Sequence, residues 1–152
     1  TAVDCAQIYQ ESAKKAGIDL TVNKVSGDGY WDNVWLKVPF CAVYWGRRMS
    51  ADASLTQVYG ADEKGAPAAW NDSKWVNADF QQLITEARVE LDDAKRKEMY
   101  NKAQELISED GGMICFAITD YLDGYAKNVM GNAPHSRYDM NDNRIAEKGW
   151  FA

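Results

Sequence analysis

The sequence Phe40-Cys-Ala-Val-Tyr-Trp-Gly-Arg-Arg-Met49 decides how the rest of this chain is interpreted. Its apolar and aromatic residues run without a break into a Trp-Gly corner, which predicts a strand at 40–45 that is buried on both faces. Arg47 and Arg48 follow at once, where the strand should end and a helix should begin. In α/β proteins the carboxyl end of a buried strand is where small ligands bind. The alternative is a surface turn with two solvated arginines.

The rest of the sequence alternates between helical and extended patterns. Apolar residues that recur three or four positions apart predict helices, while apolar–polar alternation or a short apolar run predicts strands. Helices are expected over residues 2–16, 30–35 and 51–59, and in a pair that begins at Asn77 and at Asp92 or Asp93 and ends at Gly111-Gly112. Strands are expected over residues 18–25, 40–45 and 113–118, a loop over 60–76 and a polar, turn-rich tail over 119–152. This order predicts an α/β fold in which helices flank a small sheet.

Composition narrows the classes of function. The chain has 152 residues, enough for one well-cored domain, and is 46% hydrophobic and 26% charged, as is usual for a globular domain. Its formal net charge of −6, without an extended basic block, argues against a nucleic-acid partner. The apolar runs are far shorter than the roughly 18–20 residues of a membrane span. Six Trp and eight Tyr are many for this length, and amphipathic aromatic side chains often line ligand sites.

Residues typical of catalytic or metal sites are sparse. The only histidine, His135, lies in the polar tail, where we expect a surface position. The sequence has no nucleophile elbow, no phosphate-binding glycine loop and no His-Glu-x-x-His motif. Cys5, Cys41 and Cys115 are too far apart for a usual zinc site, and we expect Cys41 and Cys115 to be buried free thiols in strands, with a bridge between them as the alternative. The sequence therefore favours a binding protein over an enzyme, with no metal and no cofactor.

The order of short motifs resembles the carboxyl-terminal lobe of extracytoplasmic solute-binding proteins of the peptide/nickel class, which serve ABC importers. The resemblance covers roughly residues 4–118, and it extends less firmly into the tail at Glu147-Lys-Gly-Trp-Phe151. The motifs that carry it are Lys15-Ala-Gly-Ile-Asp-Leu20, Asp28-Gly-Tyr-Trp31, Tyr44-Trp-Gly46, Trp70-Asn-Asp-Ser-Lys-Trp75, Asn77-Ala-Asp-Phe80, Ala87-Arg-Val-Glu-Leu-Asp92, Arg96-Lys-Glu-Met-Tyr100 and Asp110-Gly-Gly-Met-Ile114.

This resemblance implies one lobe of a periplasmic-binding-protein type II fold. Residues 1–118 would form the ligand-binding lobe, and residues 119–152 would be a tail that crosses back toward a missing amino-terminal lobe. The two lobes of such receptors close over the ligand about a hinge. The implied partners are that lobe and the membrane subunits of the importer, and the implied location is periplasmic or lipid-anchored.

The expected ligand follows from a departure from the family pattern. Peptide-binding members commonly place an aspartate after the Trp-containing strand to hold an α-amino group, whereas this sequence has Arg47 and Arg48 there. Arginine favours a carboxylate, so we expect a carboxylated small molecule, such as an opine-like or acidic sugar conjugate, or a peptide held by its carboxyl end. Asp52 would serve an amine or pair with one arginine. The full set of expected ligand-binding residues is Arg47, Arg48, Trp45, Tyr44, Asp52, Trp70, Asn71 and Trp75.

Several of these assignments have structural alternatives. Trp45 is equally well explained as a core residue, Asn71 as a turn residue, and Trp31 and Trp35 as one buried helical stripe. A stand-alone carbohydrate-binding or adaptor module with surface tryptophans is the competing function. A small hydrolase lobe is a third reading, and it lacks a nucleophile–base pair in the sequence.

Overall fold

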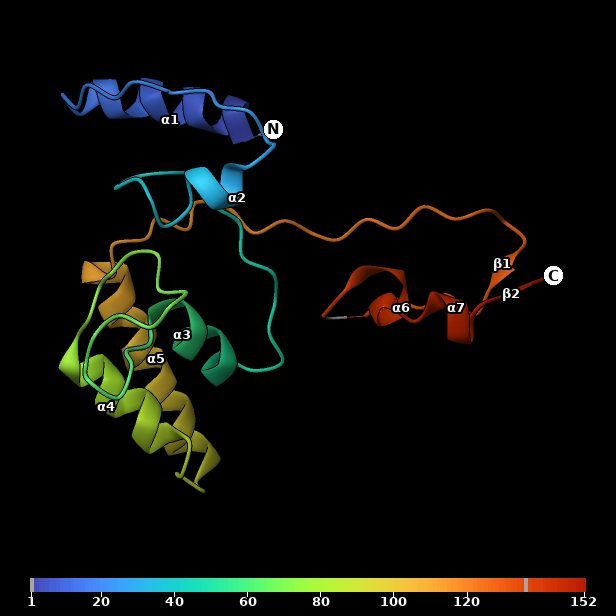
Figure 1. Cartoon of the computed structure of the whole chain (residues 1–152). Helices are drawn as coiled ribbons and strands as arrows, with labels where there is room; N and C mark the ends of the chain where they lie inside the picture. Colours follow the sequence, from blue (N-terminus) through green and yellow to red (C-terminus); the bar gives the residue numbers. More distant parts are fainter. Residues whose placement is uncertain (1, 136) are drawn as a thin grey trace. The chain divides into compact units, whose positions relative to one another are not determined.

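The structure is a computed structural model that describes residues 2–135 and 137–152. Most of its regular secondary structure is helical (Figure 1). The chain forms two compact units, residues 2–45 and residues 46–152. The sheet in the described part of the chain is two-stranded and antiparallel. At this coarse level the chain is a mixed helix-and-strand structure, as the sequence predicts.

The first unit contains two helices, α1 (Ala2–Lys15) and α2 (Tyr30–Asn33). Helix α1 ends before Gly17, which has the left-handed φ of 77° that favours glycine at this position. The amide of Gln10 donates a hydrogen bond of 2.6 Å to the carbonyl of Leu20, which ties the following segment back to the helix. Along the apolar stripe predicted for α1 only Ala13 is buried, and Ile8 is 70% exposed.

The second unit contains a cluster of three longer helices, α3 (Ala51–Tyr59), α4 (Ala78–Ala87) and α5 (Asp93–Asp110). Side-chain caps start all three. Ser50 Oγ accepts a hydrogen bond from the backbone N–H of Ala53, Asn77 Oδ1 accepts one from Phe80, and Asp92 Oδ1 accepts two in the first turn of α5. The predicted helix start at Asn77 is therefore confirmed, and of the two starts considered for α5 the structure has Asp92.

The core of this cluster lies between the apolar stripes of the three helices. Phe80 is completely buried, and its ring lies 5.2 Å from the ring of Trp75 and 6.2 Å from that of Tyr59, measured between centroids. The buried residues of the core are Leu55, Phe80, Ile84 and Ala103. Burial of large side chains at this density is the main favourable contribution to the stability of the helical cluster.

The predicted loop over residues 60–76 is confirmed, and it packs against the same helices. Asn71 is fully buried in it, and its amide nitrogen donates to the carbonyls of Gly60 at 3.1 Å and Trp75 at 2.8 Å. Gly60 ends α3 at a point where a Cβ atom would lie 2.1 Å from the carbonyl oxygen of Thr56. A side chain at residue 60 would therefore collide with the last turn of α3, which favours glycine at this position.

Short elements make up the chain from residue 129 onward. Strands β1 (Val129–Met130) and β2 (Trp150–Phe151) pair in antiparallel fashion, with Val129 opposite Phe151. Between them lie α6 (Asp139–Asn143) and α7 (Ile145–Lys148). Residues 140–143 have φ values between 46° and 63°, so α6 is a left-handed turn built from non-glycine residues.

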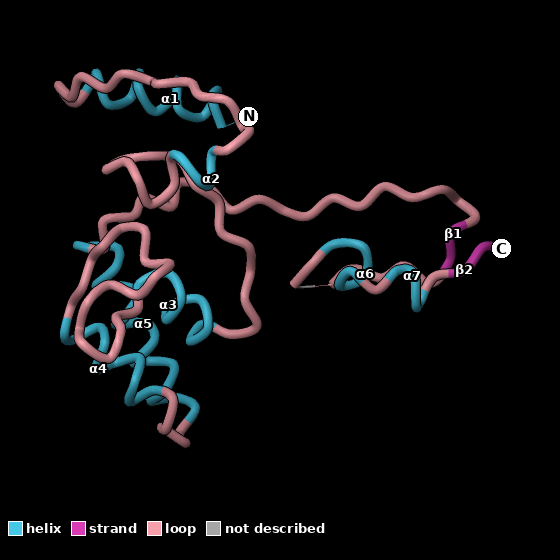
Figure 2. The backbone as a smooth tube through the Cα atoms, viewed as in Figure 1, coloured by secondary structure: helices cyan, strands magenta, loops and turns pink. Residues whose placement is uncertain are grey.

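The strands predicted at 18–25, 40–45 and 113–118 are absent, and this part of the prediction was wrong (Figure 2). These segments have no regular secondary structure, and Phe40 and Ile118 are 64% and 85% exposed rather than buried. An apolar run is compatible with a strand, but a strand forms only when a neighbour completes its hydrogen-bond ladder. No such neighbour lies beside these segments within the described residues.

The absence of these strands also makes the predicted burial of Cys41 and Cys115 wrong, whereas the preferred prediction of no bridge between them is confirmed. None of the three cysteines forms a disulfide, so the Cys41–Cys115 bridge is absent. Cys115 is exposed and Cys41 is half-buried, because the strands that would have buried them do not form.

Candidate functional site

Arg48 is held in place at the corner where the apolar run meets α3. Its Nε donates to Gln57 Oε1 at 2.5 Å, and its Nη1 donates to the carbonyl oxygen of Gly46 at 2.8 Å. Because Gln57 lies near the end of α3, the guanidinium is attached to the last turn of that helix. This arrangement fixes a positive charge beside the corner.

Arg47 is exposed, and its guanidinium carbon lies 5.9 Å from the centroid of the Tyr121 ring. This is the distance of a weak cation–π contact at a surface. Arg47 and Arg48 therefore contact different parts of the second unit, one the extended segment and the other α3.

Tyr44 and Trp45 belong to an aromatic group in the first unit. The ring of Tyr44 lies 5.2 Å from that of Trp31 in an edge-to-face arrangement, and the ring of Trp45 lies 6.4 Å from that of Trp35. Tyr44 is 78% exposed and Trp31 is 43% exposed. The buried stripe considered for Trp31 and Trp35 is therefore wrong for Trp31, and this aromatic group presents apolar surface to solvent.

Three further predicted site residues lie in or near the loop over 60–76. Trp75 packs on Phe80 and donates its indole N–H to Asp110 Oδ2 at 2.9 Å, which connects the loop to the end of α5. Asn71 is fully buried and bonded to backbone carbonyls, as its structural alternative requires. Trp70, by contrast, is 48% exposed.

Asp52 pairs with an arginine that the sequence did not indicate. Its Oδ1 accepts a hydrogen bond of 2.8 Å from Arg88 Nε, and the pair is partly exposed. Thr56 Oγ1 contacts both side chains and thereby ties α3 to the end of α4.

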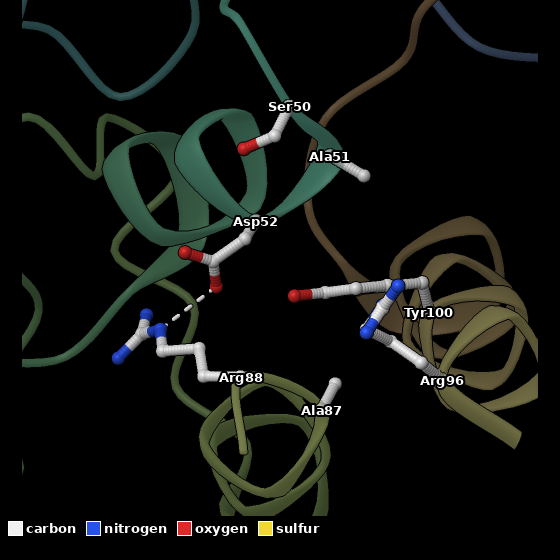
Figure 3. Close-up of a pocket in the computed structure, with 7 residues that line it drawn as sticks. All are labelled: Ser50, Ala51, Asp52, Ala87, Arg88, Arg96 and Tyr100. Carbon is white, nitrogen blue, oxygen red and sulfur yellow. Dashed lines mark hydrogen bonds and ion pairs between the residues drawn. The ribbon is translucent and has the colours of Figure 1, made fainter. Parts of the chain in front are cut away.

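A pocket of about 330 Å³ opens beside this ion pair, at the point where the three helices meet (Figure 3). The start of α3, the end of α4 and the first two turns of α5 form its walls. Its lining residues are Ser50, Ala51, Asp52, Ala87, Arg88, Arg96 and Tyr100.

Tyr100 gives the pocket a hydroxyl group that points toward Asp52 (Figure 3). Burial raises the pKa of Tyr100 above its usual value of 10.0, and the negative charge of Asp52 adds to the effect, while the charge of Arg88 opposes it. The hydroxyl is therefore protonated at neutral pH and can donate a hydrogen bond.

Arg96 is the other cation in the pocket wall. Its Nη1 donates to the backbone carbonyl of Glu90 at 2.9 Å, and its Nη2 pairs with Asp93, whose side chain is 87% exposed. Arg96 and Tyr100 are four residues apart and so lie on the same face of α5. That spacing was the only signal in the sequence that could have linked them, because Asp52 and Arg88 are far away along the chain.

Other kinds of site find no support in the part of the chain that the structure describes. No group of three or more His, Cys, Asp or Glu residues there is arranged to hold a metal ion. Among the described helices, none has the length and apolar character needed to cross a membrane. Comparison of the chain with protein-family models, curated proteins and solved structures gives no match.

Proposed function

We propose that this chain is the carboxyl-terminal lobe of the solute-binding component of an ABC importer. In this proposal the receptor captures a small peptide or a carboxylated small molecule outside the cytoplasm, in the periplasm or on a lipid anchor. An amino-terminal lobe completes the binding site, and the membrane subunits of the importer receive the ligand.

The observation that carries the proposal is the fixed guanidinium at the corner. Arg48 is held by Gln57 and by the carbonyl of Gly46, beside the exposed Arg47. A guanidinium that is already positioned loses little conformational freedom when an anion binds, so it favours a carboxylate ligand.

A second observation supports the assignment as one lobe of a larger receptor. The segment after α5 exposes large apolar side chains over most of their area, 69% for Phe116, 85% for Ile118 and 92% for Leu122. Contiguous exposed apolar surface usually marks an interface. In the proposed receptor, the other lobe covers these side chains.

The test uses the complete receptor. Mass spectrometry of small molecules that co-purify with it identifies the ligand, and calorimetry then compares wild type with Arg47→Ala and with Arg48→Ala. Loss of one charge-assisted contact should weaken binding by about 10- to 100-fold. Arg144→Ala is the matched control, because Arg144 is also exposed and pairs with Glu147 on the same short helix segment. Unchanged affinity in Arg47→Ala would remove Arg47 from the site, and unchanged affinity in both variants would contradict the proposal.

The exposed aromatic rings favour a second candidate, a stand-alone carbohydrate-binding module. Tyr44, Trp31 and Trp70 each present a large part of their surface to solvent. Such a module should bind oligosaccharides as an isolated chain, whereas half of a two-lobed receptor should not, since half its contacts are missing. Calorimetry of the isolated chain against oligosaccharides separates the two functions.

A further inference from the structure

The pocket between α3, α4 and α5 has the size of a site for one small molecule. Its volume of about 330 Å³ lies at the lower end of the roughly 300–1,000 Å³ range of small-molecule sites. A ligand the size of a monosaccharide fits such a volume. Two alanines, Ala51 and the completely buried Ala87, line it together with charged and hydroxyl-bearing side chains (Figure 3).

The charges of the pocket favour a ligand with one negative charge. The charge of Asp52 is balanced by Arg88, whose Nε lies 2.8 Å from Oδ1. Arg96 is then the remaining cation of the lining, and its acidic partner Asp93 is 87% exposed. An exposed ion pair of this kind contributes little energy, so a ligand carboxylate can replace Asp93 while the Glu90 carbonyl keeps the guanidinium in position.

The other polar groups favour hydroxyl groups over an amine on the same ligand. Asp52 offers a carboxylate acceptor beside the hydroxyl of Tyr100 (Figure 3). A ligand ammonium there would be repelled by the guanidinium of Arg96 in the same lining, and Asp52 already has Arg88 as its counter-charge. A neutral hydroxyl donates to the carboxylate without that cost. Ser50 adds a hydroxyl at the start of α3.

We propose that this pocket is a second ligand site, which binds a hydroxylated monocarboxylate of monosaccharide size, the class that includes the uronic acids. Arg96 binds the carboxylate, and Asp52 and Tyr100 bind hydroxyl groups. The site lies on the helical cluster and needs no second lobe, so it is independent of the function proposed for the corner at Arg47 and Arg48.

Calorimetry on the full chain tests the proposal with sodium D-glucuronate and, as the matched neutral sugar, D-glucose. Glucuronate should bind saturably in the millimolar range, at least about tenfold more tightly than glucose. Arg96→Gln should weaken glucuronate binding by about 10- to 100-fold. Tyr100→Phe, which removes only a hydroxyl group, should weaken it by about three- to tenfold. Lys102→Gln, on the same helix but outside the pocket, should bind as wild type does.

Asp93→Asn is the control for variants that lose binding only because they unfold. Removing the acidic competitor of Arg96 should strengthen glucuronate binding by about two- to fivefold, which a folding defect does not produce. Equal binding of glucose and glucuronate, undiminished binding by Arg96→Gln, or no saturable binding up to about 10 mM would overturn the proposal. The proposal would also be overturned if Arg47→Ala lost glucuronate binding while Arg96→Gln retained it. That result would place the binding site at the corner beside Arg47.

Discussion

The helical cluster of α3, α4 and α5 and the segment that leaves it at Met113 contain similar apolar residues in opposite surroundings. Phe80 in α4 is completely buried, whereas Phe116 is 69% exposed. A helix satisfies its backbone hydrogen bonds internally and needs only one apolar face to pack. An extended segment depends on a neighbour for its hydrogen bonds, and within the described residues this segment has none. Apolar composition therefore does not determine burial by itself.

The largest expected effect is the difference between two phenylalanine truncations. Phe80→Ala should lower the free energy of unfolding by about 3–5 kcal/mol, because it leaves a cavity between Tyr59 and Trp75. Phe116→Ala should change it by less than about 0.5 kcal/mol. Urea unfolding followed by circular dichroism measures both. Similar losses would mean that the exposed segment packs in solution.

A smaller difference in the free energy of unfolding is expected between alanine substitutions of two asparagines. Asn71→Ala should cost about 1–3 kcal/mol, because it removes the side-chain donor to the carbonyl of Trp75 and one of two donors to the carbonyl of Gly60, which keeps only the N–H of Ala68. Asn101→Ala, on the exposed face of α5, should be close to neutral. The same unfolding measurements apply. A neutral Asn71→Ala would show that the loop over 60–76 does not share the stability of the helices.

Because of Tyr59, the stability of the helical cluster should fall as the pH rises through the alkaline range. Burial raises the pKa of Tyr59 from 10.0 to about 12, and the negative charges of Asp72 and Cys115 add to this effect. Because the folded state favours the protonated phenol, this contribution is complete below pH 10 and is lost as the pH rises toward 12. Tyr59→Phe should flatten the fall of Tm over this range while costing less than about 1 kcal/mol at pH 7. A parallel fall in both proteins would contradict the assignment.

The smallest effect in the isolated chain is expected for Ile118→Asp. Ile118 is 85% exposed, so an aspartate there should change the free energy of unfolding by less than about 0.5 kcal/mol. In a complete receptor the same change should be strongly destabilising, because it would place a charge in the contact between the lobes. Comparing the Tm of the variant in the two contexts measures this. A neutral effect in the complete receptor would mean that the other lobe does not cover the segment.

The helices could be predicted because their signals are local. Asn77 and Asp92 mark helix starts through side-chain caps, and Gly17 marks an end through its left-handed backbone. The strand predictions at 40–45 and 113–118 were wrong because a strand requires a partner, and the sequence pattern does not contain the position of that partner. The motif order that resembles a solute-binding lobe stays a prediction.

The candidate site likewise depends on contacts between distant parts of the sequence, which the sequence pattern does not contain. Asp52 lies in the first turn of a predicted helix and was among the expected site residues, whereas Ser50 was not. The pairing of Asp52 with Arg88 depends on how α3 and α4 pack, and the pocket depends on Arg96 and Tyr100 from a third helix. Trp75 and Asn71 were expected to bind ligand because they are an aromatic and an amide in a loop. In the structure both stabilise the packing of that loop.

The lack of space at Gly60 predicts how this position tolerates change. A side chain there would collide with the carbonyl oxygen of Thr56, an atom of the backbone that no rotamer change can move aside. The carbonyl of Gly60 also receives the amide of Asn71, so a shift at residue 60 would disturb the last turn of α3 and the anchor of the loop together. A gene library randomised at codon 60 and selected for folded protein should return glycine almost exclusively, whereas one randomised at the open Gly65 should retain other residues with a left-handed preference, such as asparagine.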